Sequence, residues 1–317
     1  MSTRIFGMLL TGLALAMAVL IIIEIVPPLG ARSDTDVAAP GDAVNIDINK
    51  SIVPPVFRTI EEANSQLIMR GTSAPEAVLT LMKNRVRVNQ TRSNGDGEWE
   101  VRTDALPNEI ATFDMTLAPT TGGRIWSDET VIRATAAPKL GANPSAQGET
   151  LARPPKALII VTAPGGPSRI VQNPFPSDPV DGPLSMGPID YDDSGGVIFS
   201  GRSTIPGRVR IYGDGQAIGE TQISSAGRWF FIAADTVPER TYKIAAELMT
   251  STGVLSRVSV ELTRLPRAVD TEIISDIPVV LVDDKSWQVR RTLIGGGAQY
   301  TAVFDPARAN ADPLTLE

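Results

Sequence analysis

The stretch from Gly71-Thr72-Ser73 to Gly97-Glu98-Trp99 returns 130 residues later as Gly201-Arg202-Ser203 to Gly227-Arg228-Trp229. In each copy, the tryptophan lies 28 residues after the first glycine. Self-similarity at a fixed spacing is typical of repeated supersecondary units, whose shared residues serve turn geometry and packing. The sequence therefore predicts two similar modules and argues against a single catalytic domain.

The residues inside each copy follow the two-residue period of β-strands. Val86 and Val88 alternate with polar residues in the first copy, as Val209 and Ile211 do in the second. Asp214-Gly215 is a typical hairpin turn. Short alternating runs separated by Gly and Pro, without a convincing helix, predict an antiparallel β-sandwich for each module.

Two stretches, 57–135 and 195–264, resemble bacterial immunoglobulin-like domains. The similarity lies in the order G-x-Ser, a V-x-(Val/Ile/Leu) strand, a turn, and G-x-W. It implies an immunoglobulin-like sandwich and says little about a ligand. Trp99 and Trp229 have two interpretations, a sugar-stacking platform or a core residue, and the shared strand position favours the core.

The composition excludes most catalytic chemistry. The 317 residues contain no cysteine and no histidine, which removes thiolate nucleophiles, imidazole bases and Cys/His metal sites. Paired carboxylates remain one open route to catalysis. The acid pairs Glu61-Glu62, Asp192-Asp193 and Asp283-Asp284 fall in expected turns or linkers, where solvated acids are common. We therefore expect a protein that is not an enzyme and holds no cofactor.

A metal and a nucleic acid are also not expected. Asp190, Asp192 and Asp193 form an acidic cluster, but it lacks the residue order of a calcium-binding loop. The chain carries 36 acidic and 29 basic residues, with a net charge of −7 and no basic run. Clustered Lys and Arg supply most of the affinity for a nucleic-acid backbone, so a nucleic-acid partner is excluded.

An apolar segment near the N-terminus predicts a membrane anchor. Phe6 to Ile23 is an uncharged run of 18 residues, which as a helix would span about 27 Å. A cleaved secretory signal is the alternative, but no small-x-small cleavage site follows the run. With Arg4 before it, the positive-inside rule keeps the N-terminus cytoplasmic. We expect a single-pass protein of the inner (cytoplasmic) membrane, with its C-terminal region in the periplasm.

The remaining boundaries follow from composition. Stretches rich in Ala, Asp, Gly and Pro predict flexible connections, and a proline-rich insertion follows Ala163. The expected organisation is a signal anchor at 1–28, a tether at 29–52, a first module at 53–135, a linker at 136–155, a second module with the insertion at 156–265, and a separate segment at 277–317.

The C-terminal segment has a different pattern. Ile277 to Val282 predicts a strand, and the spacing of apolar residues from Ser286 to Leu293 and from Gln299 to Phe304 predicts two short helices. This order resembles the LysM domain, a βααβ module that binds peptidoglycan, on Ser286-Trp287, Arg290-Arg291, Tyr300, Val303-Phe304, Ala309-Asn310 and Asp312-Pro313. Asp283-Asp284-Lys285 departs from the Gly-Asp turn of that family, and its closing turn and strand are missing.

The LysM resemblance implies a glycan-binding loop and a partner. The candidate glycan-binding residues are Asp283, Asp284, Lys285, Ser286 and Trp287, and the implied partner is peptidoglycan. The expected fold class is mainly β: an N-terminal transmembrane helix, two immunoglobulin-like antiparallel β-sandwich modules and a small, degenerate α+β LysM-like remnant. The expected function is a non-enzymatic, membrane-anchored envelope protein whose tail contacts peptidoglycan. The alternative is a scaffold or partner-binding subunit of a membrane protein complex.

Overall fold

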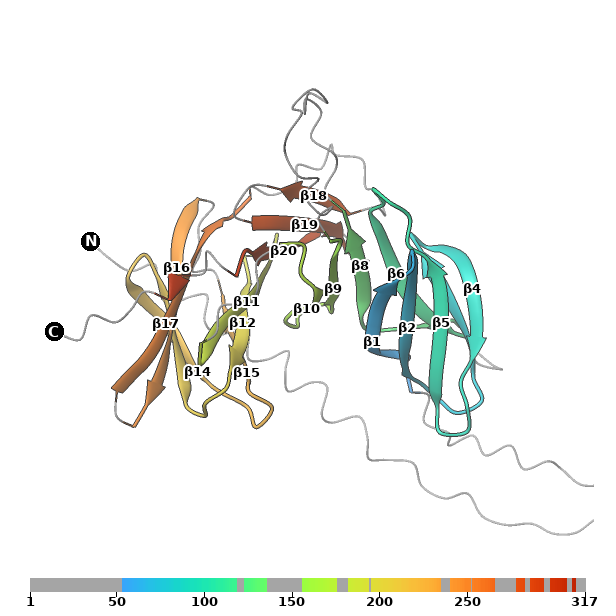
Figure 1. The fold of residues 1–317 in the computed structure, drawn as a ribbon, viewed down its shortest axis with the longest axis horizontal. Helices are drawn as coiled ribbons and strands as arrows, with labels where there is room; N and C mark the ends of the chain where they lie inside the picture. The colour runs from blue at the N-terminus through green and yellow to red at the C-terminus, as the bar shows by residue number, and fades with distance from the viewer. Residues whose placement is uncertain are drawn as a thin grey trace, which may run out of the picture. The chain divides into compact units, whose positions relative to one another are not determined.

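The structure, a computed structural model, describes residues 53–118, 123–135, 156–175, 182–193, 195–234, 240–251, 253–265, 278–282, 286–293, 297–306 and 310–311. Every regular element in these ranges is a β-strand, and the strands form four antiparallel sheets (Figure 1). Residues Ser51–Glu317 form one compact unit. Within the described ranges, no helix has the length and hydropathy to cross a bilayer, and Phe6 to Ile23 lies outside them.

The first module is a sandwich of two sheets. One sheet has the order β1-β2-β5, and the other has the order β4-β3-β6-β8, with β7 beside β6. Between them lies a core that includes Leu67, Met69, Trp99, Phe113 and Met115, all buried. The strand bounds are β1 Val56–Ala63, β2 Gln66–Thr72, β3 Val78–Lys83, β4 Val86–Arg92, β5 Glu98–Asp104, β6 Ala111–Leu117, β7 Ile125–Trp126 and β8 Thr130–Ala134.

The second module repeats this plan. Its first sheet contains β11-β12-β15 and its second has the order β14-β13-β16-β17. Phe199, Val209, Trp229 and Ile244 are buried between the sheets. The strand bounds are β11 Leu184–Asp192, β12 Val197–Ser203, β13 Arg208–Gly213, β14 Gln216–Gln222, β15 Arg228–Ala233, β16 Thr241–Thr250 and β17 Gly253–Thr263. Each module is therefore an immunoglobulin-like β-sandwich, in which three neighbouring strands of one sheet pack against four neighbouring strands of another.

The repeated glycine and tryptophan are partners across neighbouring strands. Gly71 lies opposite Trp99 in the β2–β5 pair, and Gly201 lies opposite Trp229 in the β12–β15 pair. A Cβ on Gly71 would come within 2.3 Å of the Trp99 ring, and one on Gly201 within 2.4 Å of the Trp229 ring. The indole thus covers the backbone of a residue without a side chain. Both tryptophans are buried, so the interpretation as core residues is confirmed.

The second glycine of each copy closes the same turn. Gly97 and Gly227 have φ angles of +82° and +68°, a backbone conformation that favours glycine. Their carbonyls accept hydrogen bonds from Ser73 N and Ser203 N, both at 2.8 Å. The repeated sequence therefore encodes one strand pair and the turn that enters it.

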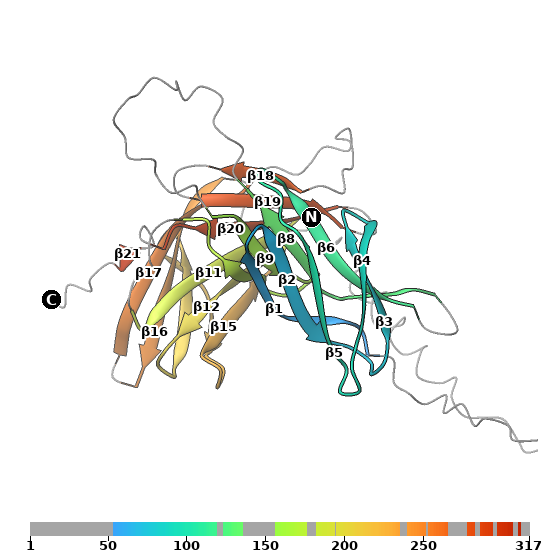
Figure 2. The same cartoon turned by 45° about the vertical axis from the view of Figure 1, so that its right-hand side comes forward.

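Additional strands extend both modules. In the first module, β9 (Leu158–Thr162) pairs with β8, and β10 (Arg169–Gln172) pairs with β9. In the second module, β20 (Ala298–Phe304) pairs with β11, followed by β19 (Ser286–Thr292) and β18 (Val279–Val282). A short strand, β21 (Asn310–Ala311), pairs with β17. Figure 2 shows the six-stranded sheet β15-β12-β11-β20-β19-β18.

These strands correct the expected fold class. The helices expected over Ser286–Leu293 and Gln299–Phe304 are instead the strands β19 and β20, so the α+β LysM-like assignment is wrong. The apolar spacing in this segment suits either element. Pairing with β11 decides for strands, because it provides hydrogen-bond partners and a buried face for an alternating pattern. The strand expected over Ile277 to Val282 is present as β18, Val279–Val282.

The boundary between the modules also differs from the expectation. β9 and β10, assigned from the sequence to the second module, extend the sheet of the first, because β9 pairs with β8 and β10 pairs with β9. Proline-rich composition marks irregular chain, but it does not say which sheet the next strand joins. The expected tether at 29–52 and most of the expected linker at 136–155 lie outside the described residues.

The close approach of glycine and tryptophan generates a prediction. Gly71→Ala should destabilise the protein by about 1–3 kcal/mol or more, because its Cβ would meet the Val56 carbonyl oxygen at 1.9 Å as well as the Trp99 ring. Gly95→Ala is the matched control, since its nearest atom would be 4.0 Å away. Urea denaturation measures both. Equal midpoints for the two variants would contradict this account of the repeat.

Candidate functional site

The strongest candidate for a functional element is the place where the additional strands meet, which we call the junction. It is a third hydrophobic cluster formed by Ile132 and Ala134 on β8, Leu158 and Ile160 on β9, Trp287 and Val289 on β19, and Val303 on β20. The first four residues belong to the first module and the last three to the second. The junction therefore joins two modules that each have a core of their own.

The strand β9 is buried on both faces because it serves two cores. Ile159 and Val161 face the core of the first sandwich, while Leu158 and Ile160 face the junction. All five residues of this strand are buried. An uninterrupted apolar strand is the expected sequence of such a position. The run Ala157-Leu158-Ile159-Ile160-Val161 was the signal in the sequence that could have located the junction.

Trp287 is the largest side chain of the junction. Its ring is 4% exposed and meets the Phe175 ring edge to face, with the centroids 6.4 Å apart. Ser286, next to it, is also buried. The ring consequently has no open face on which a sugar could stack. Asp283, Asp284 and Lys285, the other candidate glycan-binding residues, lie outside the described residues.

A buried polar group accompanies the apolar junction. Asp190 on β11 accepts hydrogen bonds from Ser168 N at 2.7 Å, from Ser168 Oγ at 2.5 Å and from Thr301 Oγ1 at 2.6 Å. Ser168 lies between β9 and β10 of the first module, whereas Asp190 and Thr301 belong to the second. Hydrogen bonds across the contact determine which residues face each other. An apolar cluster specifies that alignment less strictly.

Burial perturbs the charges beside this contact. Burial raises the pKa of the Asp190 carboxyl, although the hydrogen bonds from Ser168 and Thr301 favour its ionised form. Burial lowers the pKa of the Arg291 guanidinium, and the carboxylates of Asp114 and Asp190 oppose that shift. Arg291 also donates to Gln299 Oε1, at 2.8 and 3.0 Å. These partners offset part of the cost of burying charge.

The described acid pairs that the sequence analysis considered have structural partners. Glu61 pairs with Arg70 at 3.3 Å, and Glu62 receives both Nε and Nη2 of the buried Arg133, at 3.0 and 2.7 Å. Asp193 Oδ2 accepts from Ala298 N at 2.7 Å. No group of three or more acidic side chains within the described ranges is arranged to hold a metal ion. Asp190, one of the three acids of the cluster, accepts hydrogen bonds from Ser168 and Thr301 instead of pointing toward Asp192 and Asp193.

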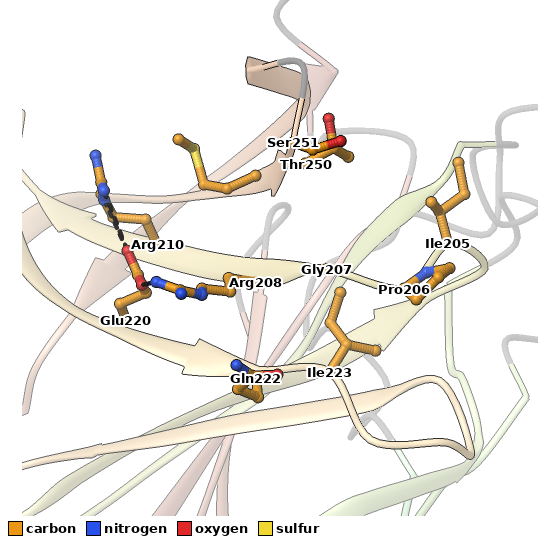
Figure 3. A pocket seen from close by; sticks show the side chains of 11 residues that line it. Ile205, Pro206, Gly207, Arg208, Arg210, Glu220, Gln222, Ile223, Thr250 and Ser251 are labelled. Carbon is orange, nitrogen blue, oxygen red and sulfur yellow. Dashed lines mark hydrogen bonds and ion pairs between the residues drawn. The ribbon is translucent and has the colours of Figure 1, made fainter.

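An open depression of about 660 Å³ lies at one end of the second module, beside β13 and β14. Ile205, Pro206 and Ile223 line it on one side, and charged residues line it on the other. Figure 3 shows Glu220 between two guanidinium groups, with Arg208 Nη1 at 2.7 Å and Arg210 Nη2 at 3.1 Å. Both cations therefore share one carboxylate.

Comparison with known proteins adds little to this geometry. No protein-family model matches the sequence, and no curated protein matches it either. Among solved structures, the chain has a likeness to the "Central Fibronectin-III array of RIM-binding protein", with 8% identity and a TM-score of 0.23 over 76% of this chain and 80% of that chain. The assignment of each module as an immunoglobulin-like sandwich rests on the strand order and cores described above.

The buried carboxyl of Asp190 generates a pH-dependent prediction. Its pKa is raised in the folded protein, so the folded state binds more protons than the unfolded state above about pH 4. The contribution of this group to stability therefore falls as pH rises through the folded pKa. The variant Asp190→Asn has no carboxyl group at this position, so its stability lacks this decrease. The stability of the wild type relative to this variant should therefore decline from pH 4 to pH 8, as measured by urea denaturation.

The variant Asp96→Asn, on an exposed turn, controls for the loss of one negative charge. A constant difference between the wild type and Asp190→Asn across this pH range would contradict the burial of an ionisable group at the junction.

Proposed function

We propose that this protein is a non-enzymatic, membrane-anchored scaffold that presents two connected immunoglobulin-like modules outside the cytoplasmic membrane. The junction is the observation that carries the proposal. The strands that follow each sandwich, β9–β10 and β18–β20, contribute to a shared hydrophobic cluster. A scaffold that holds partners apart at a set geometry requires such a contact between its modules.

The junction also changes which of the two expected functions is better supported. Contact with peptidoglycan was expected at Asp283 to Trp287 in a LysM-like loop, and of these residues the Trp287 ring is packed against Phe175 inside the junction. A scaffold or partner-binding subunit of a membrane complex requires no exposed tryptophan. The second function is therefore the one we propose.

The anchor of this scaffold is the apolar run from Phe6 to Ile23. Its length suits the hydrocarbon thickness of a bilayer, and Arg4 before it favours a cytoplasmic N-terminus. In this arrangement the inner membrane holds the chain by one pass, and both modules lie in the periplasm. Residues 29–52, rich in Ala and Asp, would separate the modules from the membrane surface.

Removing the central ring of the junction should separate the unfolding of the modules. Trp287→Ala leaves a large void among apolar side chains and should cost about 3–5 kcal/mol. The wild type should show one calorimetric unfolding transition and the variant two, because the modules would no longer share a buried cluster. Trp126→Ala removes a half-buried tryptophan outside the junction and should keep one transition. A single transition in Trp287→Ala would contradict the proposed coupling.

Anchoring is tested by cell fractionation. The full chain should remain with the membranes after alkaline washing and after enzymatic digestion of the cell wall, because lipid alone holds it. A chain lacking residues 6–23 should not be retained by the membranes. Release of the full chain by cell-wall digestion, or sedimentation of its exported region with purified sacculi, would instead support the peptidoglycan function.

A further inference from the structure

The strand β15 combines a free sheet edge with exposed apolar side chains. It is the terminal strand of the sheet β15-β12-β11-β20-β19-β18 and pairs only with β12 among the described strands. Phe230 and Ile232 lie on the outer face of this strand, with 50% and 54% of their surface exposed. An exposed apolar edge strand is a template for pairing with another chain, and monomeric proteins usually protect such edges.

The strand register directs two backbone segments of β15 toward the free edge. Ser203 N donates to Gly227 O across the β12–β15 pair, so these opposite residues form a hydrogen-bonded pair. Hydrogen-bonded and non-hydrogen-bonded pairs alternate along an antiparallel ladder. Phe230, opposite Ser200, and Ile232, opposite Ile198, are therefore non-hydrogen-bonded pairs whose N–H and C=O groups face away from β12.

The equivalent strand of the first module has charged residues at these positions. With the 130-residue offset, Glu100 of β5 corresponds to Phe230, and Arg102 corresponds to Ile232. Glu100 Oε1 lies 2.9 Å from Arg102 Nη2, and Glu100 Oε2 lies 2.7 Å from Arg70 Nε. The first module therefore protects this edge with paired charges, one of the usual devices against strand pairing.

A backbone group of the edge is also covered in the first module alone. Asn89 Nδ2 on β4 donates to Arg102 O at 2.7 Å. The corresponding residue of the second module is Gly219, which has no side chain to donate, and the Phe231 ring occupies the space where its Cβ would lie. Within the described residues, Ile232 has no such covering group. Two independent features that protect the first edge are thus absent from the second.

Positive charge at one end of the exposed strand indicates that a segment bound there carries a negatively charged side chain. Arg228 is exposed on the same face as Phe230 and Ile232 and lies opposite the exposed Arg202 of β12. Neither arginine forms an ion pair within the described part of the chain, whereas Arg70 and Arg102 of the first module do. Like charges at opposite positions of a strand pair are destabilising. A carboxylate beside them would relieve the repulsion.

The surface is small and continuous with the junction. Ile198 lies opposite Ile232 on one side and opposite Asp190 on the other, so the apolar patch begins where the contact with the first module ends. Two exposed apolar side chains cannot supply the 1,200–2,000 Å² that a stable dimer of folded domains buries. A short extended segment, held by backbone hydrogen bonds and two or three side chains, matches the available surface.

We propose that β15 is a strand-addition site for an extended segment of another protein. The segment carries two apolar side chains at alternate positions, next to Phe230 and Ile232, and an Asp or Glu at the following alternate position, next to Arg228. Its backbone pairs with the free N–H and C=O groups of Phe230 and Ile232. This site does not depend on membrane anchoring.

The probe is a fluorescent peptide with the pattern Glu-Thr-Val-Thr-Val-Thr-Glu, which places a carboxylate next to Arg228 in either strand direction. Binding to the full chain in detergent micelles is measured by fluorescence anisotropy. We expect saturable binding that weakens with salt, together with slowed amide hydrogen exchange at Phe230 and Ile232. A peptide with Lys in place of Glu should bind at least tenfold more weakly.

Matched variants test each part of the site. Phe230→Glu with Ile232→Arg gives β15 the residues of β5 and should weaken binding at least tenfold. Leu255→Arg changes another exposed apolar residue, on β17 of the same module, and should leave binding unchanged. Arg228→Glu should reverse the preference toward the Lys peptide. N-methylation of every second peptide amide should abolish binding when the methylated amides are those that face β15. The peptide methylated on the other set of amides should still bind.

Absent or unsaturable peptide binding, or equal binding by wild type and the Phe230→Glu/Ile232→Arg variant, would overturn the proposal. Sedimentation that reveals a dimer, lost in that same variant, would also overturn it, because a second copy of the chain would then be the occupant of the edge.

Discussion

The pairing of a tryptophan with a glycine on the neighbouring strand is the constraint on which both sandwiches depend. The indole of Trp99 or Trp229 occupies the space where a Cβ of Gly71 or Gly201 would lie, so the two strands have one register in which the ring fits. A shift by one residue would turn every side chain of the strand to the other face. The same register sends Phe230 and Ile232 outward and directs their backbone groups to the sheet edge.

The two modules share this constraint but differ in the residues on their outer surfaces. Glu100 and Arg102 of the first module, which form an ion-pair network with Arg70, correspond to the exposed Phe230 and Ile232 of the second. Packing requirements in the core are met equally in both. The outer positions carry no such requirement, so the two modules can differ there without a cost to the core.

The additional strands make the chain more than two sandwiches in series. β9 contributes one face to the first core and the other to the junction, and β19 and β20 bring Trp287 and Val303 to it. The hydrogen bonds among Ser168, Asp190 and Thr301 add orientation to an otherwise apolar contact. The proline-rich stretch 136–155, predicted from the sequence to be a linker, thus precedes β9, one of the strands that connect the modules.

The sequence by itself determined the local features: two repeated units, strand-forming alternation, and tryptophans in the core, because turn glycines and a two-residue period act over a few residues. Tertiary structure decided the rest. The residues from Ser286 to Phe304 have an apolar spacing that suits a helix or a strand, and only pairing with β11 favours the strand. The location of Trp287 likewise depended on a partner surface, β8 and β9, more than 120 residues earlier in the chain. Contacts between residues so far apart leave no periodic signal in the sequence, and they also decide which sheet edge remains free.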